Sequence, residues 1–172
     1  PPAPPPSKTD EDVEQEKKLE LQFGRMYQII TRDDRLEKIS ENIVKHFMGR
    51  GHRGKAMYVA IDKATAVKMY DKVSAHWKET IEDLKRRLKY TWEGESKFLQ
   101  EEIKYMEMTD MAVVVSPGQN EVEEMRLKGV DILPHRKRMV KEDLDKKFKD
   151  PDDPFRLVFV CAMWMTGFDV PS

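Results

Sequence analysis

The residues with the clearest chemical potential lie near the end of the chain, in the string Thr166-Gly167-Phe168-Asp169. Thr166 can donate a hydrogen bond to a phosphate, and Asp169 can accept hydrogen bonds from ribose hydroxyls. Gly167 lets the backbone approach a ligand closely. An ordinary turn explains the same residue types equally well, with Gly167 supplying the bend and Asp169 capping the next element. The string is therefore a candidate ligand-binding loop, and the plain turn stays open.

An apolar run precedes this string and must position it. Residues 157–163 are large, β-branched or aromatic for the most part, and Pro154 and Gly167 bound the run. Continuous apolar runs of this length are typical of strands buried on both faces in parallel sheets that helices cover. Ligands of open α/β sheets bind beyond the carboxyl ends of the strands. We therefore expect the string to lie at the ligand-binding edge of such a sheet.

Two further runs of this kind, 56–61 and 111–116, occur earlier in the chain. Between the runs, apolar residues at helical spacing predict helices at about 64–90, 96–108, 121–127 and 141–149. Strands that alternate with helices predict an α/β fold. We expect a parallel sheet in three layers, with helices on both faces and right-handed crossovers.

The part of the chain before the first strand has a different character. Residues 1–12 hold five prolines in the first six positions, followed by acidic residues, which is typical of an extended, solvated linker. Residues 13–54 show helical spacing of apolar residues and end in a glycine-rich stretch. The sequence therefore predicts a linker at 1–12, connecting helices at 13–54 and one α/β domain at 55–172.

The second of the connecting helices is predicted at 33–48. Asp34 is followed three residues later by Glu37, which resembles a capping box with Asp in place of Ser or Thr.

Composition argues against a strongly basic protein, a disulfide-stabilised protein and a membrane protein. The 31 lysines and arginines nearly balance the 32 acidic residues, so any contact with nucleic acid must come from a local patch. The single cysteine, Cys161, lies in an apolar run and cannot form an internal disulfide, which fits a reducing cytoplasm. No apolar stretch is long enough to span a membrane and no signal peptide is evident, so we expect a cytoplasmic protein without membrane contact.

Basic residues gather in three places that could supply a local patch. The first surrounds the glycines that end the 33–48 helix and consists of Lys45, Arg50, His52, Arg53 and Lys55. Compensation of the helix dipole and a solvated loop explain this cluster, and contact with a DNA phosphate is the alternative. In the other two places, four basic residues lie between Lys85 and Lys89, and three form the run Arg136-Lys137-Arg138. A solvated helix face explains the group at 85–89, and a solvated loop explains the run at 136–138 at least as well as contact with DNA does. The neighbouring His135 has no second histidine or cysteine at ligand spacing, so a metal site there is not expected.

Several segments of the chain resemble those of a known protein family. Residues 164–171, WMTGFDVP, are similar to motif V of the motor subunit of type I restriction enzymes, which are superfamily-two, helicase-like DNA translocases. Met165 and Val170 are mild departures from the usual leucine and alanine. The segment after the first strand, with Ala66 and Tyr70, resembles motif IV of the same family, and 114–121 resembles a further family segment.

The resemblance covers about residues 35–172 and implies an incomplete second RecA-like domain of a two-domain motor. It implies nucleotide contacts from Gly167 and Asp169 and contacts to the DNA backbone from Asp62, Lys63, Thr65 and Thr166. ATP and Mg²⁺ would be the cofactors, with most of their ligands outside this chain. The partners would be double-stranded DNA and the modification and specificity subunits of the restriction complex.

Several motifs of such a motor do not occur in this sequence. It contains no G-x-x-x-x-G-K-[S/T] phosphate loop, no acidic magnesium motif and no Q-x-x-x-x-G-R-x-x-R arginine motif. We therefore expect this chain alone to be inactive, although the parent subunit would be an ATP-dependent translocase and site-specific deoxyribonuclease. Two alternatives stay open: a non-catalytic α/β interaction module, and the second domain of another superfamily-two DNA helicase.

Overall fold

The computed structural model of the chain describes residues 10–51 and 53–161. The chain divides into two compact units, Pro1–Leu36 and Glu37–Ser172. The predicted boundaries at residues 12 and 54 stay predictions. The string Thr166–Asp169 lies outside the described residues, as do most of the proline-rich positions. None of the described helices is both long and apolar enough to cross a bilayer.

The first unit consists mainly of helix α1, Asp10–Ile30, and the start of α2, Asp33–Gly49. Both helices agree with the predictions from apolar spacing. The predicted capping box is wrong, because Asp34 lies inside α2 and accepts a hydrogen bond from Arg32 Nε at 2.8 Å. Glu37 contacts Lys72 and His76 instead of the backbone at the helix start.

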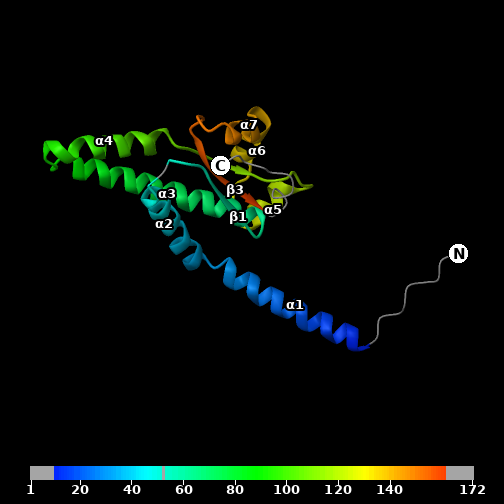
Figure 1. Cartoon of the computed structure of the whole chain (residues 1–172). Helices are drawn as coiled ribbons and strands as arrows, with labels where there is room; N and C mark the ends of the chain where they lie inside the picture. The colour runs from blue at the N-terminus through cyan, green and yellow to red at the C-terminus, as the bar shows by residue number, and fades with distance from the viewer. Residues whose placement is uncertain (1–9, 52, 162–172) are drawn as a thin grey trace. The chain divides into compact units, whose positions relative to one another are not determined.

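The second unit is built on a three-stranded sheet of β1, Ala56–Ala60, β2, Asp110–Val114, and β3, Phe155–Cys161. All pairings are parallel and the order is β1-β3-β2, so the last strand lies in the middle (Figure 1). The prediction of an α/β fold with a parallel sheet is confirmed, and the sheet is small. The finer RecA-like identity stays a prediction.

Five helices accompany these strands: α3, Lys63–Leu88; α4, Glu93–Met108; α5, Glu121–Leu127; α6, Leu133–Lys141; and α7, Leu144–Lys149. Figure 1 shows α3 and α4 as a long antiparallel hairpin. Trp77 joins the two helices, because its indole Nε1 donates to the carbonyl oxygen of Met106 at 2.9 Å inside the core.

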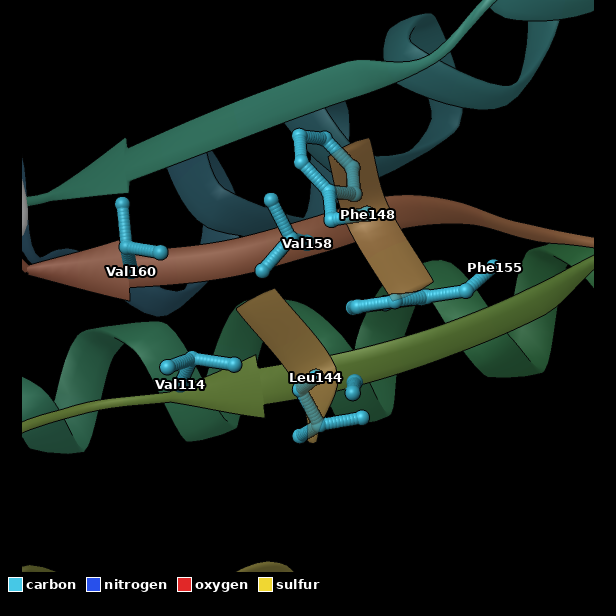
Figure 2. Packing of buried hydrophobic residues seen from close by; sticks show 7 residues of the cluster. Val114, Leu144, Phe148, Phe155, Val158 and Val160 are labelled. Atoms are coloured by element: carbon cyan, nitrogen blue, oxygen red, sulfur yellow. The ribbon is translucent and has the colours of Figure 1, made fainter. Parts of the chain in front are cut away.

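Helices contact both faces of the sheet. On one face, Tyr70 of α3 meets Phe159 of β3 edge to face, with ring centroids 5.8 Å apart. Side chains alternate along a strand, so Val158 and Val160 point to the other face. Figure 2 shows them with Leu144 and Phe148 of α7 and Val114 of β2 in one apolar cluster.

An irregularity in the β2–β3 ladder adds one residue to this cluster. Asp110 pairs with Phe155, whereas Met111 pairs with Leu157, so β3 has an extra residue between them. Such a bulge changes the face to which the side chains before it point. Phe155 thereby joins the α7 face, where its ring lies 5.3 Å from that of Phe148 and is fully buried.

The basic run Arg136–Arg138 lies within helix α6, so its interpretation as a loop is wrong. Pro134 occupies the first turn of α6, a position that proline favours because its missing N–H needs no partner there. Arg138 contacts the carboxylates of Asp110 and Glu142, and Lys137 is exposed. Two of the three basic side chains in the run therefore lie against the protein.

Candidate functional site

The carboxyl edge of the sheet is the candidate site, because all three parallel strands end there. β1 leads through Asp62 into α3, and β2 leads through residues 115–120 into α5. The central strand β3 ends at Cys161, five positions before Thr166 in the sequence. Segments that are far apart in the sequence therefore converge on this edge.

Asp62 begins helix α3. Its backbone is extended, with φ of −146°, and its Oδ1 accepts a hydrogen bond from the backbone N–H of Thr65 at 2.7 Å. This is an N-cap, which satisfies one of the free N–H groups of the first turn. Lys128 Nζ lies 3.6 Å from the other carboxylate oxygen. Thr65 is only 3% exposed, so the cap is joined directly to the core.

Arg136 of α6 holds the loop that follows β2. Its Nη1 donates to the carbonyl oxygen of Val115 and its Nη2 to that of Ser116, both at 3.1 Å. Its Nε and Nη2 also donate to the two carboxylate oxygens of Glu121, at 2.9 and 2.6 Å. A guanidinium has five N–H donors in a rigid fork. Nη1 also contacts the sulfur of Met139 at 3.7 Å, so every donor has a partner.

Glu121 connects this loop to the end of β1. It is the first residue of α5, its side chain is 8% exposed, and its Oε1 also accepts from Lys63 Nζ at 3.3 Å. A buried carboxylate is stable only when it is paired and hydrogen-bonded. Glu121 therefore links Lys63, on one side of the central strand, with Arg136 on the other.

The short loop before Glu121 has two positions of special geometry. Asn120 has a left-handed backbone with φ of 52°, a conformation that asparagine tolerates better than most residues. A Cβ at Gly118 would lie 3.1 Å from Lys63 Nζ, closer than ordinary contact. The absence of a side chain at Gly118 therefore lets the Lys63 ammonium approach the loop backbone.

Among the described residues that form ion pairs at this edge, positive charges outnumber negative ones. Lys63, Lys128 and Arg136 face Asp62 and Glu121, which leaves one positive charge over. Arg136 satisfies both oxygens of Glu121, so the weaker contact with Lys63 is the one that an incoming anion can replace most easily. Chemically, this arrangement is suited to holding a phosphate or another oxyanion near Lys63.

Three of the predicted site residues, Asp62, Lys63 and Thr65, lie together at this edge. The other three, Thr166, Gly167 and Asp169, lie outside the described residues. The roles assigned to all six stay predictions. The second group at the edge consists of Glu121, Lys128 and Arg136. Sequence reasoning did not single out Lys128, and it considered Glu121 and Arg136 separately without pairing them. An isolated charge carries no signal of a partner far along the chain.

Within residues 10–51 and 53–161, no cluster of histidine, cysteine or acidic side chains could hold a metal ion. His135 packs edge to face on the Tyr70 ring, with centroids 4.7 Å apart. Burial lowers the pKa of His135 below its ordinary value. The imidazole is therefore neutral at pH 7 and serves as part of the packing beneath the edge.

Comparison with known proteins relates this chain to type I restriction enzymes. The chain is 29% identical over 163 residues to a Methanocaldococcus jannaschii protein named as the type I restriction enzyme MjaIXP endonuclease subunit. It is 55% identical over 31 residues to the Haemophilus influenzae type I restriction enzyme HindI endonuclease subunit. The first match covers 93% of this chain and 12% of the relative, and the second covers 18% and 3%. No protein-family model and no solved structure matches the chain. Over nearly all of its length, the chain is therefore similar to a small part of one protein named as a type I restriction endonuclease subunit.

Proposed function

We propose that this chain is a segment of the DNA-translocating restriction subunit of a type I restriction enzyme, and part of its second RecA-like motor domain. The observation that carries the proposal is the similarity to a named endonuclease subunit across 93% of the chain. The parallel sheet, with an excess positive charge at its carboxyl edge, supports it. Neither alternative, an interaction module or another helicase, is favoured by the names of these relatives.

In this proposal Lys63 contributes charge directly to a DNA phosphate. Asp62 is an anion and repels phosphate, and Thr65 is buried, so both act by fixing the first turn of α3. The N–H groups of such a turn favour anions. Thr166 donates its hydroxyl hydrogen to a second phosphate.

The same proposal assigns the nucleotide to Gly167 and Asp169. Asp169 accepts hydrogen bonds from the ribose hydroxyls, and Gly167 permits close approach of the backbone. ATP, with Mg²⁺, supplies the free energy for movement when bound to the longer protein, whose other segments provide most of the ligands. Because one short loop would carry both Thr166 and Asp169, nucleotide binding and DNA binding would be coupled.

The longer protein would act in the cytoplasm on double-stranded DNA, in a complex with modification and specificity subunits. The 172-residue chain lacks the phosphate loop and the arginine motif. We therefore propose that it neither hydrolyses ATP nor cleaves DNA when it is isolated.

DNA-stimulated ATP hydrolysis by the longer protein tests this function. We expect Asp169→Ala to reduce turnover by about tenfold or more, because two hydrogen bonds from the ribose to a carboxylate are removed. Asp152→Ala, in an exposed turn before β3, is the matched control and should retain turnover. A folded longer protein without DNA-stimulated hydrolysis would contradict the motor assignment.

A further inference from the structure

Two arginines meet on one tyrosine at the opposite, amino edge of the sheet. Arg53 lies three positions before β1, and Arg156 is the second residue of β3. Their guanidinium carbons lie 4.8 and 4.6 Å from the ring centroid of Tyr105, which belongs to α4. These distances are within the range of a cation–π contact. The aromatic ring therefore holds two positive charges close together.

Most of the hydrogen-bond donors in this group have no partner among the described residues. The hydroxyl of Tyr105 is buried and makes no hydrogen bond within the described part of the chain. Arg156 Nη1 makes one long contact, 3.5 Å, to the hydroxyl oxygen of Thr109. Arg53 has no hydrogen-bond or ion-pair partner among residues 10–51 and 53–161. The Arg53 donors are exposed to water, so an anion can take the place of that water without breaking a contact among the described residues.

Open pockets flank Tyr105 on this surface. One, of about 230 Å³, is bounded by Phe47, Phe98 and Arg53, and the other, of about 280 Å³, by Lys104, Met108 and Arg156. Each is large enough for a phosphate group. A ligand can therefore reach the two arginines without displacing the core.

The charge balance around Tyr105 favours an anion. Lys104 adds a third cation, whereas Glu101 and Glu102 supply two carboxylates. In the described part of the chain, neither carboxylate forms an ion pair with Arg53 or Arg156. Burial chiefly, and Arg156 in addition, lower the pKa of nearby Lys55 although Asp150 and Asp153 oppose them. Three cations thus face two carboxylates around the ring.

We propose that Arg53, Arg156 and Tyr105 form a second anion site, which binds a phosphate group. Guanidinium forks match the oxygens of phosphate, and they bind it more strongly than neutral donors do. The Arg53 side chain is exposed, so it can turn from the ring toward a ligand and open the buried hydroxyl of Tyr105 to an oxyanion.

This site is separate from the carboxyl edge. β3 has seven residues between the two edges, and a strand of that length spans about 23 Å. One phosphate cannot reach both sites. The phosphate could belong to the backbone of a nucleic acid or to a small phosphate compound, and the two sources share the same chemistry.

The test uses the 172-residue chain and two probes. Calorimetric titration with inorganic pyrophosphate measures binding of a small anion, and anisotropy of a labelled DNA duplex at several salt concentrations measures binding to a backbone. The variants are Arg53→Gln, the double variant with Arg156→Gln, and Tyr105→Phe. The matched control removes two exposed arginines of α3, Arg86→Gln with Arg87→Gln.

We expect the double variant to bind pyrophosphate about tenfold or more weakly if a small phosphate is the ligand. If a nucleic acid is the ligand, the slope of log affinity against log salt is negative. It becomes less steep by about 0.9 for each DNA phosphate that the variant no longer neutralises. Tyr105→Phe should weaken binding without lowering the melting temperature, because the hydroxyl has no internal partner.

Absence of both effects, or equal weakening in the control, would overturn the proposal. Arg53→Gln keeps the test decisive if the double variant does not fold, because the Arg53 side chain is exposed. Weaker anion binding by these variants, together with normal ATP turnover in the longer protein, would support this anion site and would not bear on the motor assignment. The motor assignment is tested separately by Asp169→Ala.

Discussion

Arg136→Leu is the substitution whose effect the structure specifies most closely. It removes the four hydrogen bonds through which Arg136 holds Val115, Ser116 and Glu121. Two backbone carbonyls are left without this donor. The carboxylate of Glu121 stays 8% exposed, and within residues 10–51 and 53–161 its remaining cation is Lys63, at 3.3 Å.

The magnitude follows from these interactions. Breaking a buried ion pair by removing one partner costs about 3–5 kcal/mol. Because Lys63 keeps part of the pairing, we expect the lower end, about 3 kcal/mol of unfolding free energy. Urea denaturation with a slope of about 2 kcal/mol/M would then show a midpoint lowered by about 1.5 M.

Urea unfolding followed by circular dichroism measures this change. Arg126→Leu is the matched control, because Arg126 is exposed and lies 3.7 Å from Glu123 in a surface pair. Such pairs contribute about 0–1 kcal/mol. Combining Arg136→Leu with Glu121→Leu removes the stranded carboxylate, so we expect the double variant to be more stable than Arg136→Leu alone.

An Arg136→Leu variant as stable as the Arg126→Leu control would refute this reasoning. A double variant less stable than Arg136→Leu would do so as well, because it would mean that Glu121 does not depend on Arg136 for its charge balance. Either result would remove the physical basis for treating the two loops at the carboxyl edge as one linked site.

Three further outcomes are expected. Phe155→Ala should lower unfolding free energy in urea by about 3–5 kcal/mol, because the ring is fully buried, whereas exposed Phe98→Ala should change it by less than about 0.5 kcal/mol. Burial lowers the pKa of His135, so the unfolded chain binds a proton that the folded chain does not, and stability falls as pH drops below about 6.5; His135→Gln should flatten this dependence in denaturation at neutral and mildly acidic pH. The hydrogen bond from Lys72 lowers the pKa of Glu37 below 4.5. The stabilisation from this hydrogen bond is therefore present above pH 4.5 and disappears as the pH falls through the lowered pKa of Glu37. NMR titration of the Glu37 carboxyl group would follow this change.

The local elements of this protein were largely predictable. Apolar runs at 56–61 and 111–116 correspond to β1 and β2. The helix predicted at about 64–90 corresponds to α3. Periodicity succeeds here because burial of one face selects apolar residues at fixed spacing. The basic run at 136–138 shows where this signal fails, because a short helix with three consecutive charges has little apolar periodicity.

The sequence by itself indicated a mixed α/β fold, the three strands and the likeness to type I restriction enzymes, since these depend on local patterns. Only the tertiary structure decided that β3 lies between β1 and β2, and that Glu121 connects Lys63 with Arg136. It alone also placed Arg53 and Arg156 on Tyr105. Partners separated by fifteen to about a hundred positions leave no periodic trace, because chain folding and not local spacing brings their charges together.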